Sequence, residues 1–169
     1  MKKYLSPFVC GFGAGVLQIV PVAKSLSCCF IIPLAAFFSL VLDQKAQNST
    51  AKIPTKKGLM FGLITGLYAA LFGSTFDIMI TLITRHNDIV AMLPELQKII
   101  VTFPITEEMQ KNILTLFQEV RNDILNYGFS SLYTFSVIIN NLVVNSIFGI
   151  VGGLIGVQII NKKNFNQAE

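Results

Sequence analysis

One carboxylate, Asp77, interrupts an otherwise uncharged apolar stretch of this chain, 58–84. An aspartate at the centre of a helix that crosses a bilayer costs about 2.5–3.5 kcal/mol, so it needs a polar partner or a function. We predict an intramembrane polar cluster around Asp77, and its other members are Ser74, Asn140, Asn141 and Asn145. Counted from the outer ends of two oppositely directed helices, Asp77 and the asparagines share a depth.

Three interpretations of these residues are open. It could be a structural clamp between helices, in which the amides and the hydroxyl satisfy the acid. It could handle ions or protons, since ionisable residues within spans often mark transport pathways. Alternatively, Asp77 could snorkel to the outer interface of the membrane. The first two readings require Asp77 to face inward, toward the asparagines.

No other residue pattern indicates catalysis. His86 is the single histidine and has no neighbouring ligand set, so we predict no metal site. Cys10, Cys28 and Cys29 make no disulfide framework and are predicted to be small apolar packing residues. The chain has no P-loop, GxGxxG, HExxH or GxSxG motif. We therefore expect no enzyme and no cofactor.

Four apolar blocks must position these residues, at 4–22, 26–42, 58–84 and 130–160. Each is long enough to cross a hydrocarbon core of about 30 Å as a helix, or nearly so. Only 13% of the chain is charged, about half of the usual fraction. We predict an all-α fold, an integral membrane four-helix bundle forming one domain over 1–169. The first two spans would be joined by a turn at 21–25, and Pro33 would kink the second.

The segment between the third and fourth spans, 85–129, is predicted to be an amphipathic helical insertion. Residues 88–100 place apolar side chains at helical spacing, and Pro104 ends that helix. Thr106 resembles an N-cap, and Gly128 ends the second helix. The second helix carries one apolar stripe, formed by Met109, Ile113, Phe117, Val120 and Ile124. The insertion could lie on the membrane surface, cap the bundle, or dock a partner protein or a second copy.

Glycines four residues apart form the densest pattern in the chain. They are Gly11, Gly15, Gly58, Gly62, Gly66, Gly149, Gly152, Gly153 and Gly156. Small residues at this spacing allow the backbones of two membrane helices to approach closely. We predict that these glycines mediate helix packing, either within the monomer or in a homodimer.

The basic residues predict the orientation. Eight of the 13 lysines and arginines lie at the termini and in the linker between the second and third spans. Cytoplasmic segments are enriched in such residues, so we predict that both termini are cytoplasmic and that 85–129 is extracytoplasmic. The lysines flank apolar blocks and form no basic face, which argues against nucleic-acid binding and favours lipid headgroups.

Taken together, the chain resembles the small four-span membrane proteins of unknown function found in bacteria. The resemblance rests on the span count, on Lys56-Lys57-Gly58 opening a glycine-spaced helix, and on 152–156 before Lys162-Lys163. It implies a location in the bacterial inner membrane and no particular activity. We expect a non-enzymatic scaffold, accessory or envelope-organising protein. The alternative is a small oligomeric transporter or channel that uses Asp77 and the face of Asn140, Asn141 and Asn145.

Overall fold

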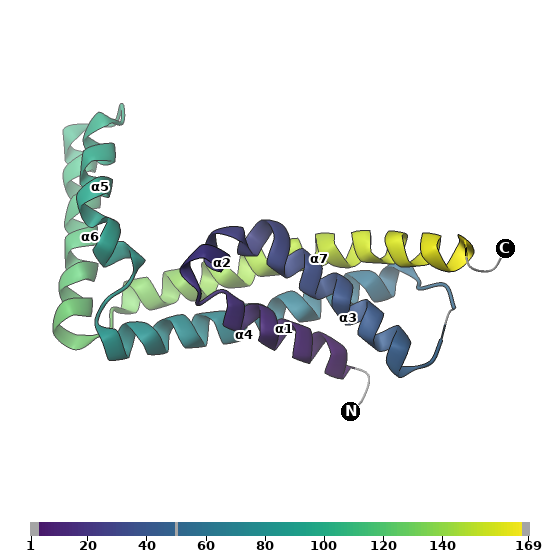
Figure 1. The fold of residues 1–169 in the computed structure, drawn as a ribbon. Helices are drawn as coiled ribbons and strands as arrows, with labels where there is room; N and C mark the ends of the chain where they lie inside the picture. Colours follow the sequence, from purple (N-terminus) through teal and green to yellow (C-terminus); the bar gives the residue numbers. More distant parts are fainter. Residues whose placement is uncertain (1–3, 50, 167–169) are drawn as a thin grey trace. The chain divides into compact units, whose positions relative to one another are not determined.

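The structure, a computed structural model, describes residues 4–49 and 51–166. Over these residues the chain forms α-helices and one π-helical turn, and no strand (Figure 1). The helices are α1 (Leu5–Leu17), α2 (Pro21–Leu26), α3 (Ile32–Ala46), α4 (Thr55–Thr84), α5 (Asp88–Thr102), α6 (Glu107–Tyr127) and α7 (Ser131–Asn166), and the π-helical turn is Ser27–Ile31. The predicted all-α class is confirmed.

Within residues 4–49 and 51–166, three helical segments are long and apolar enough to cross a membrane. They are Cys29–Ala46, Thr55–Thr84 and Ser131–Asn164, and they contain the second, third and fourth predicted spans almost entirely. The first apolar helix, α1, has 13 residues and is therefore about 20 Å long. This length falls short of a hydrocarbon core of about 30 Å, so the structure supports three spans by length and does not confirm a fourth.

The prediction for the connection between the first two blocks was wrong in detail. Residues 21–25 form helix α2 and not a turn; the chain reverses between Gln18 and Val20. Pro21 occupies the first turn of α2, where its fixed φ and its missing N–H suit a helix start. The kink expected at Pro33 stays a prediction; the structure has a π-helical turn, Ser27–Ile31, directly before α3, and Pro33 lies in the first turn of α3.

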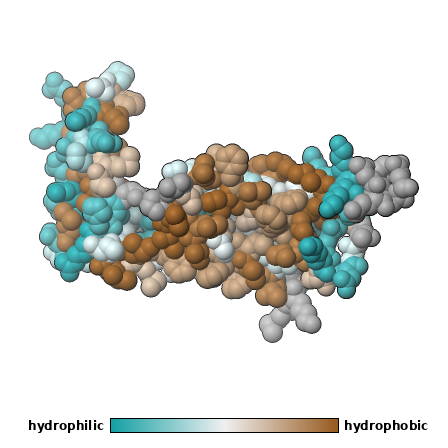
Figure 2. Space-filling model, in the orientation of Figure 1, coloured by the Kyte–Doolittle hydropathy of each residue, from teal (hydrophilic) through white to brown (hydrophobic). Residues whose placement is uncertain are grey.

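The residues divide into two compact units. The first comprises Met1–Phe76 with Ile138–Glu169, and the second comprises Asp77–Val137. Helices α4 and α7 contribute residues to both units. In the first unit, hydrophobic residues cover most of the face shown in Figure 2, and hydrophilic residues gather where α3 is joined to α4 and α7 ends. An apolar surface of this kind matches lipid as solvent.

Glycines set the contact between α4 and α7 in the first unit. A Cβ atom on Gly62 would overlap the carbonyl oxygen of Gly149, and a Cβ on Gly58 would overlap the side chain of Val157. One on Gly66 would overlap the carbonyl oxygen of Asn145. The two helices run in opposite directions, and each step of four along α4 matches a step of four back along α7. Any larger side chain on this seam would push the backbones apart.

The other glycines serve neighbouring helices of the same unit. Gly11 and Gly15 of α1 face the backbone and Cβ atoms of α4 near Thr65 and Phe72. Gly152 of α7 lies against the backbone of Pro33 in α3. Gly13 differs, since a Cβ atom there would meet no atom within 4 Å. Helix α1 therefore packs on α4, α4 on α7, and α7 on α3.

The second unit contains an antiparallel helical hairpin, α5 and α6 (Figure 1). The predicted caps of α6 are confirmed: Thr106 Oγ1 accepts the backbone N–H of Met109 at 3.4 Å, and Gly128 ends the helix with φ of 73°. Val120 and Ile124 of the predicted stripe are buried against Tyr133. Pro94 lies inside α5, and the helix continues to Thr102.

Candidate functional site

One partner of Asp77 in the second unit is a tyrosine. Tyr133, in the first turn of α7, donates its hydroxyl proton to Asp77 Oδ2 at 2.5 Å. The tyrosine is 6% exposed and packs on Val120 and Ile124 of α6. Because the donor lies on α7 and the acceptor on α4, this hydrogen bond ties the two helices together within the second unit.

Tyr133 was not predicted from the sequence, although the glycine pattern contained the information. Gly66 faces Asn145 across the α4–α7 seam. Moving eleven residues along α4, from Gly66 to Asp77, corresponds to moving back from Asn145 to residue 134, beside Tyr133. Alignment of the two helices by their expected outer ends instead places Asp77 at the level of the asparagines. The predicted bond between Asp77 and Asn140 or Asn141 joins residues of different units, and it stays a prediction.

In the first unit, two of the predicted asparagines make polar contacts between helices. Asn141 Nδ2 of α7 donates to Ser74 Oγ of α4 at 3.0 Å. Asn145 Nδ2 donates to Gln18 Oε1 at 3.3 Å, and Asn145 is only 3% exposed. Asn140 is exposed.

Gln18 is a member of this site that the sequence analysis did not identify. It caps the C-terminus of α1, and its side chain lies over Gly73, where a Cβ atom would come within 2.8 Å of Gln18 Oε1. The Nε2 atom of Gln18 is buried, and among the described residues no acceptor lies within hydrogen-bond distance of it. Its sequence signal was weak, because one glutamine at the end of an apolar block is also typical of a residue at the membrane interface.

A second set of polar contacts lies where α3 is joined to α4. Lys57 Nζ pairs with Asp43 Oδ2 at 2.5 Å, and Gln47 Nε2 donates to the same oxygen at 2.8 Å. Asn161 of α7 forms two hydrogen bonds with the backbone of Ile53, as acceptor at 2.8 Å and as donor at 3.0 Å. The ion pair joins the first turn of α4 to α3, and the two bonds of Asn161 fasten the linker to α7.

The chemistry available in these sites is hydrogen bonding. Among the described residues, no three His, Cys, Asp or Glu side chains come together as a group that could hold a metal ion. His86 is exposed, and Cys10 lies half-buried within α1. Paired amides, a hydroxyl and a carboxylate–phenol bond can hold helices together, and amides can also coordinate ions or water.

Comparison with known proteins assigns this chain to no family. No family model matches the chain, and neither a curated protein nor a solved structure matches it.

Proposed function

We propose that this chain is a non-enzymatic integral membrane protein of the bacterial inner membrane, and that it serves as a scaffold or accessory protein. In this proposal four spans form one bundle with both termini in the cytoplasm. The bundle anchors the hairpin of α5 and α6 outside the cytoplasm, where the hairpin binds a partner protein. The partner is another membrane protein or a second copy of the chain.

Helix lengths support this placement in the bilayer. Twenty residues of α4 separate Lys57 from Asp77, which is about 30 Å and matches the hydrocarbon thickness. With Lys57 at the cytoplasmic boundary, Asp77 falls at the opposite boundary. Tyrosine is enriched at membrane interfaces, so its partner Tyr133 suits that level. The carboxylate then avoids the bilayer centre, where its cost is greatest.

Helix α1 would complete the bundle as a short first span. Its length of about 20 Å leaves a mismatch of about 10 Å, which local thinning of the bilayer or polar flanking residues can accommodate. Gln18 would then lie near the outer boundary, where its side-chain oxygen accepts a hydrogen bond from Asn145. The contacts of Gly11 and Gly15 with α4 hold α1 against the neighbouring span.

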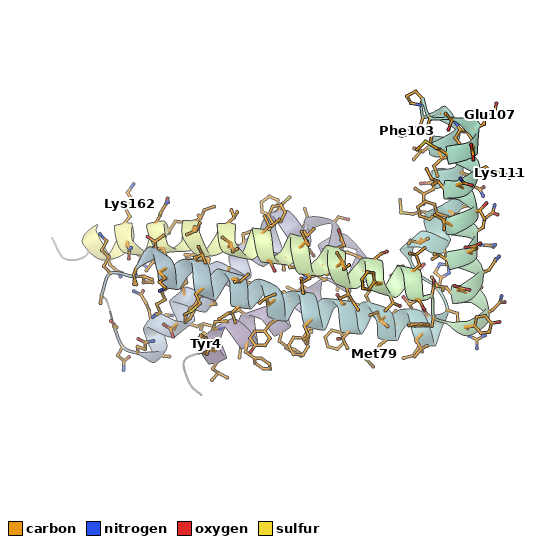
Figure 3. The ribbon with its side chains drawn as sticks, turned by 180° about the vertical axis from the view of Figure 1, so that it is seen from behind. Tyr4, Met79, Phe103, Glu107, Lys111 and Lys162 are labelled. Atoms are coloured by element: carbon orange, nitrogen blue, oxygen red, sulfur yellow. The ribbon has the colours of Figure 1, made fainter. Side chains whose placement is uncertain are left out.

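The observation that carries the partner proposal is the exposed apolar end of the hairpin. Where α5 is joined to α6, Val101, Phe103 and Met109 are 62%, 57% and 51% exposed. Phe103 and Glu107 lie close to the junction of α5 and α6, and Lys111 lies near it on α6 (Figure 3). Charged residues argue against insertion of this end into hydrocarbon, while the apolar side chains favour burial against a partner.

Photocrosslinking tests the proposal. A photoreactive p-benzoylphenylalanine at Phe103 should give a covalent adduct with another polypeptide in native membranes. The matched control carries the same photoreactive residue in place of Gln118, which is exposed on α6. Co-expression of a second copy with a tag of different mass identifies a homo-oligomer. Adducts with lipid alone at Phe103, or equal adducts at both positions, would contradict a protein-docking role.

A small transporter or channel is the second candidate. It is favoured by the buried Nε2 donor of Gln18 next to Asn145, since such a donor in a bundle could donate a hydrogen bond to a transient ligand or to water. The scaffold proposal expects no ion or proton flux above that of protein-free liposomes. A flux that Asp77→Asn abolishes while the protein stays folded would replace it by the transport proposal.

A further inference from the structure

We infer that a groove between α3 and α7, at the lysine-rich end of the first unit, binds an anionic phospholipid. The inference rests on the proposed location in a bilayer. It goes further because it assigns a specific lipid class to a specific site.

The groove combines an apolar floor with a basic rim. Its volume is about 510 Å³, and its floor includes Phe37, Val41 and Ile159. Lys45 and Lys163 line it from the last turns of α3 and α7. An apolar channel that ends at two ammonium groups is complementary to an acyl chain that ends at a phosphate.

A second hollow extends the floor along the same seam. It has a volume of about 240 Å³, shares Phe37 and Ile159 with the first, and reaches Pro33 and Ile155. Twelve residues separate Lys45 from Pro33 along the helix, which is about 18 Å. One leaflet contributes about half of the 30 Å hydrocarbon core, so the combined groove matches the length of one acyl chain.

The two lysines are available for a phosphate. Neither Lys45 nor Lys163 has an ion-pair partner among the described residues, and both are exposed. The carboxylate nearest in sequence to Lys45, Asp43, is already paired with Lys57. Ser49 also lines the groove, and its hydroxyl oxygen accepts the backbone N–H of Ala51, which leaves its proton for a phosphate oxygen. This arrangement favours an anionic headgroup over a zwitterionic one.

Tryptophan fluorescence can test the site, because the chain contains no tryptophan. Ile155→Trp places a reporter in the inner hollow, and Leu67→Trp places a control on the exposed surface of α4. The protein is reconstituted in phosphatidylcholine vesicles that contain a minor fraction of brominated phosphatidylglycerol or brominated phosphatidylcholine. We expect phosphatidylglycerol to be preferred roughly tenfold at the Ile155→Trp reporter and not at the Leu67→Trp control.

Paired lysine variants identify the headgroup contact. Lys45→Gln with Lys163→Gln should abolish the preference. Lys52→Gln with Lys162→Gln removes the same charge from outside the groove and should preserve it. Equal quenching by both lipids at Ile155→Trp, or equal effects of the two double variants, would overturn the lipid site. Absence of quenching at both reporters by either lipid would instead overturn the membrane location.

Discussion

At the level of single residues, polar side chains join α4 to α7 in each unit. Tyr133 donates to Asp77 in the second unit, and Asn141 donates to Ser74 in the first. Each bond pairs one side chain of α4 with one of α7, so a substitution at either residue tests it. These pairs depend on helix register, which composition and distance from a helix end do not define.

The bond between Tyr133 and Asp77 predicts a selective loss of stability. Tyr133→Phe removes the donor and should lower the free energy of unfolding by about 1–3 kcal/mol, since the carboxylate loses its bond. Unfolding in mixed micelles by a denaturing detergent measures this. Tyr127→Phe is the matched control, because Tyr127 is 75% exposed in the same unit. Equal stability of both variants with the wild type would show that the bond contributes nothing.

Substitutions of Asp77 distinguish hydrogen bonding from charge. Asp77→Asn retains an oxygen that can accept the Tyr133 proton, so we expect it to be tolerated. Asp77→Leu removes every acceptor and should destabilise the protein by roughly 1–3 kcal/mol. The same unfolding assay compares them. If Asp77→Asn is as damaging as Asp77→Leu, the negative charge itself is required.

At the level of elements, local signals were reliable where the chemistry is local. Thr106 and Gly128 defined the ends of α6 correctly, since a side-chain acceptor and a left-handed glycine act within one turn. The π-helical turn before Pro33 and the reversal at Gln18 were not predicted. Both depend on how the first hairpin fits against its neighbours, and no short motif encodes that fit.

The α4–α7 seam predicts that added volume is costly there. Gly62→Leu or Gly153→Leu would drive a side chain into the opposing backbone. Either variant should lower the free energy of unfolding in detergent by about 1–3 kcal/mol. Gly13→Leu is the control, because a Cβ atom at Gly13 has open space and leucine favours a helix more than glycine does. Thermal unfolding compares the three variants. A loss for Gly13→Leu equal to that for Gly62→Leu would show that bulk at the α4–α7 seam carries no special cost.

At the level of the whole molecule, the apolar helices were easier to predict than the number of spans. Long uncharged blocks match lipid as solvent, and within the described part of the chain three helical segments have the length and composition to cross a membrane. Block 4–22 was counted as a span because its apolar run is nearly continuous in sequence. The structure divides that run at Gln18, so the length of the helix, and not of the apolar block, decides whether it can cross.

The predicted topology can be tested with an impermeant thiol reagent on intact spheroplasts. In a background without Cys10, Cys28 and Cys29, a cysteine at Glu107 should be labelled and a cysteine at Lys52 should not. The reason is that Lys52 belongs to the linker between α3 and α4, beside Lys45, Lys56 and Lys57, and basic linkers remain cytoplasmic.

Disruption of the membrane provides the control for this topology, because both cysteines should then react. Both positions are exposed in the structure, so burial within the protein would not explain a failure to react. Labelling at Lys52 alone in intact spheroplasts would reverse the orientation. Labelling at both positions would contradict the crossing of α4, because α4 is the helix that leads from the basic linker toward the hairpin of α5 and α6. One pair of cysteines therefore tests both the orientation predicted from the lysines and the membrane crossing of α4.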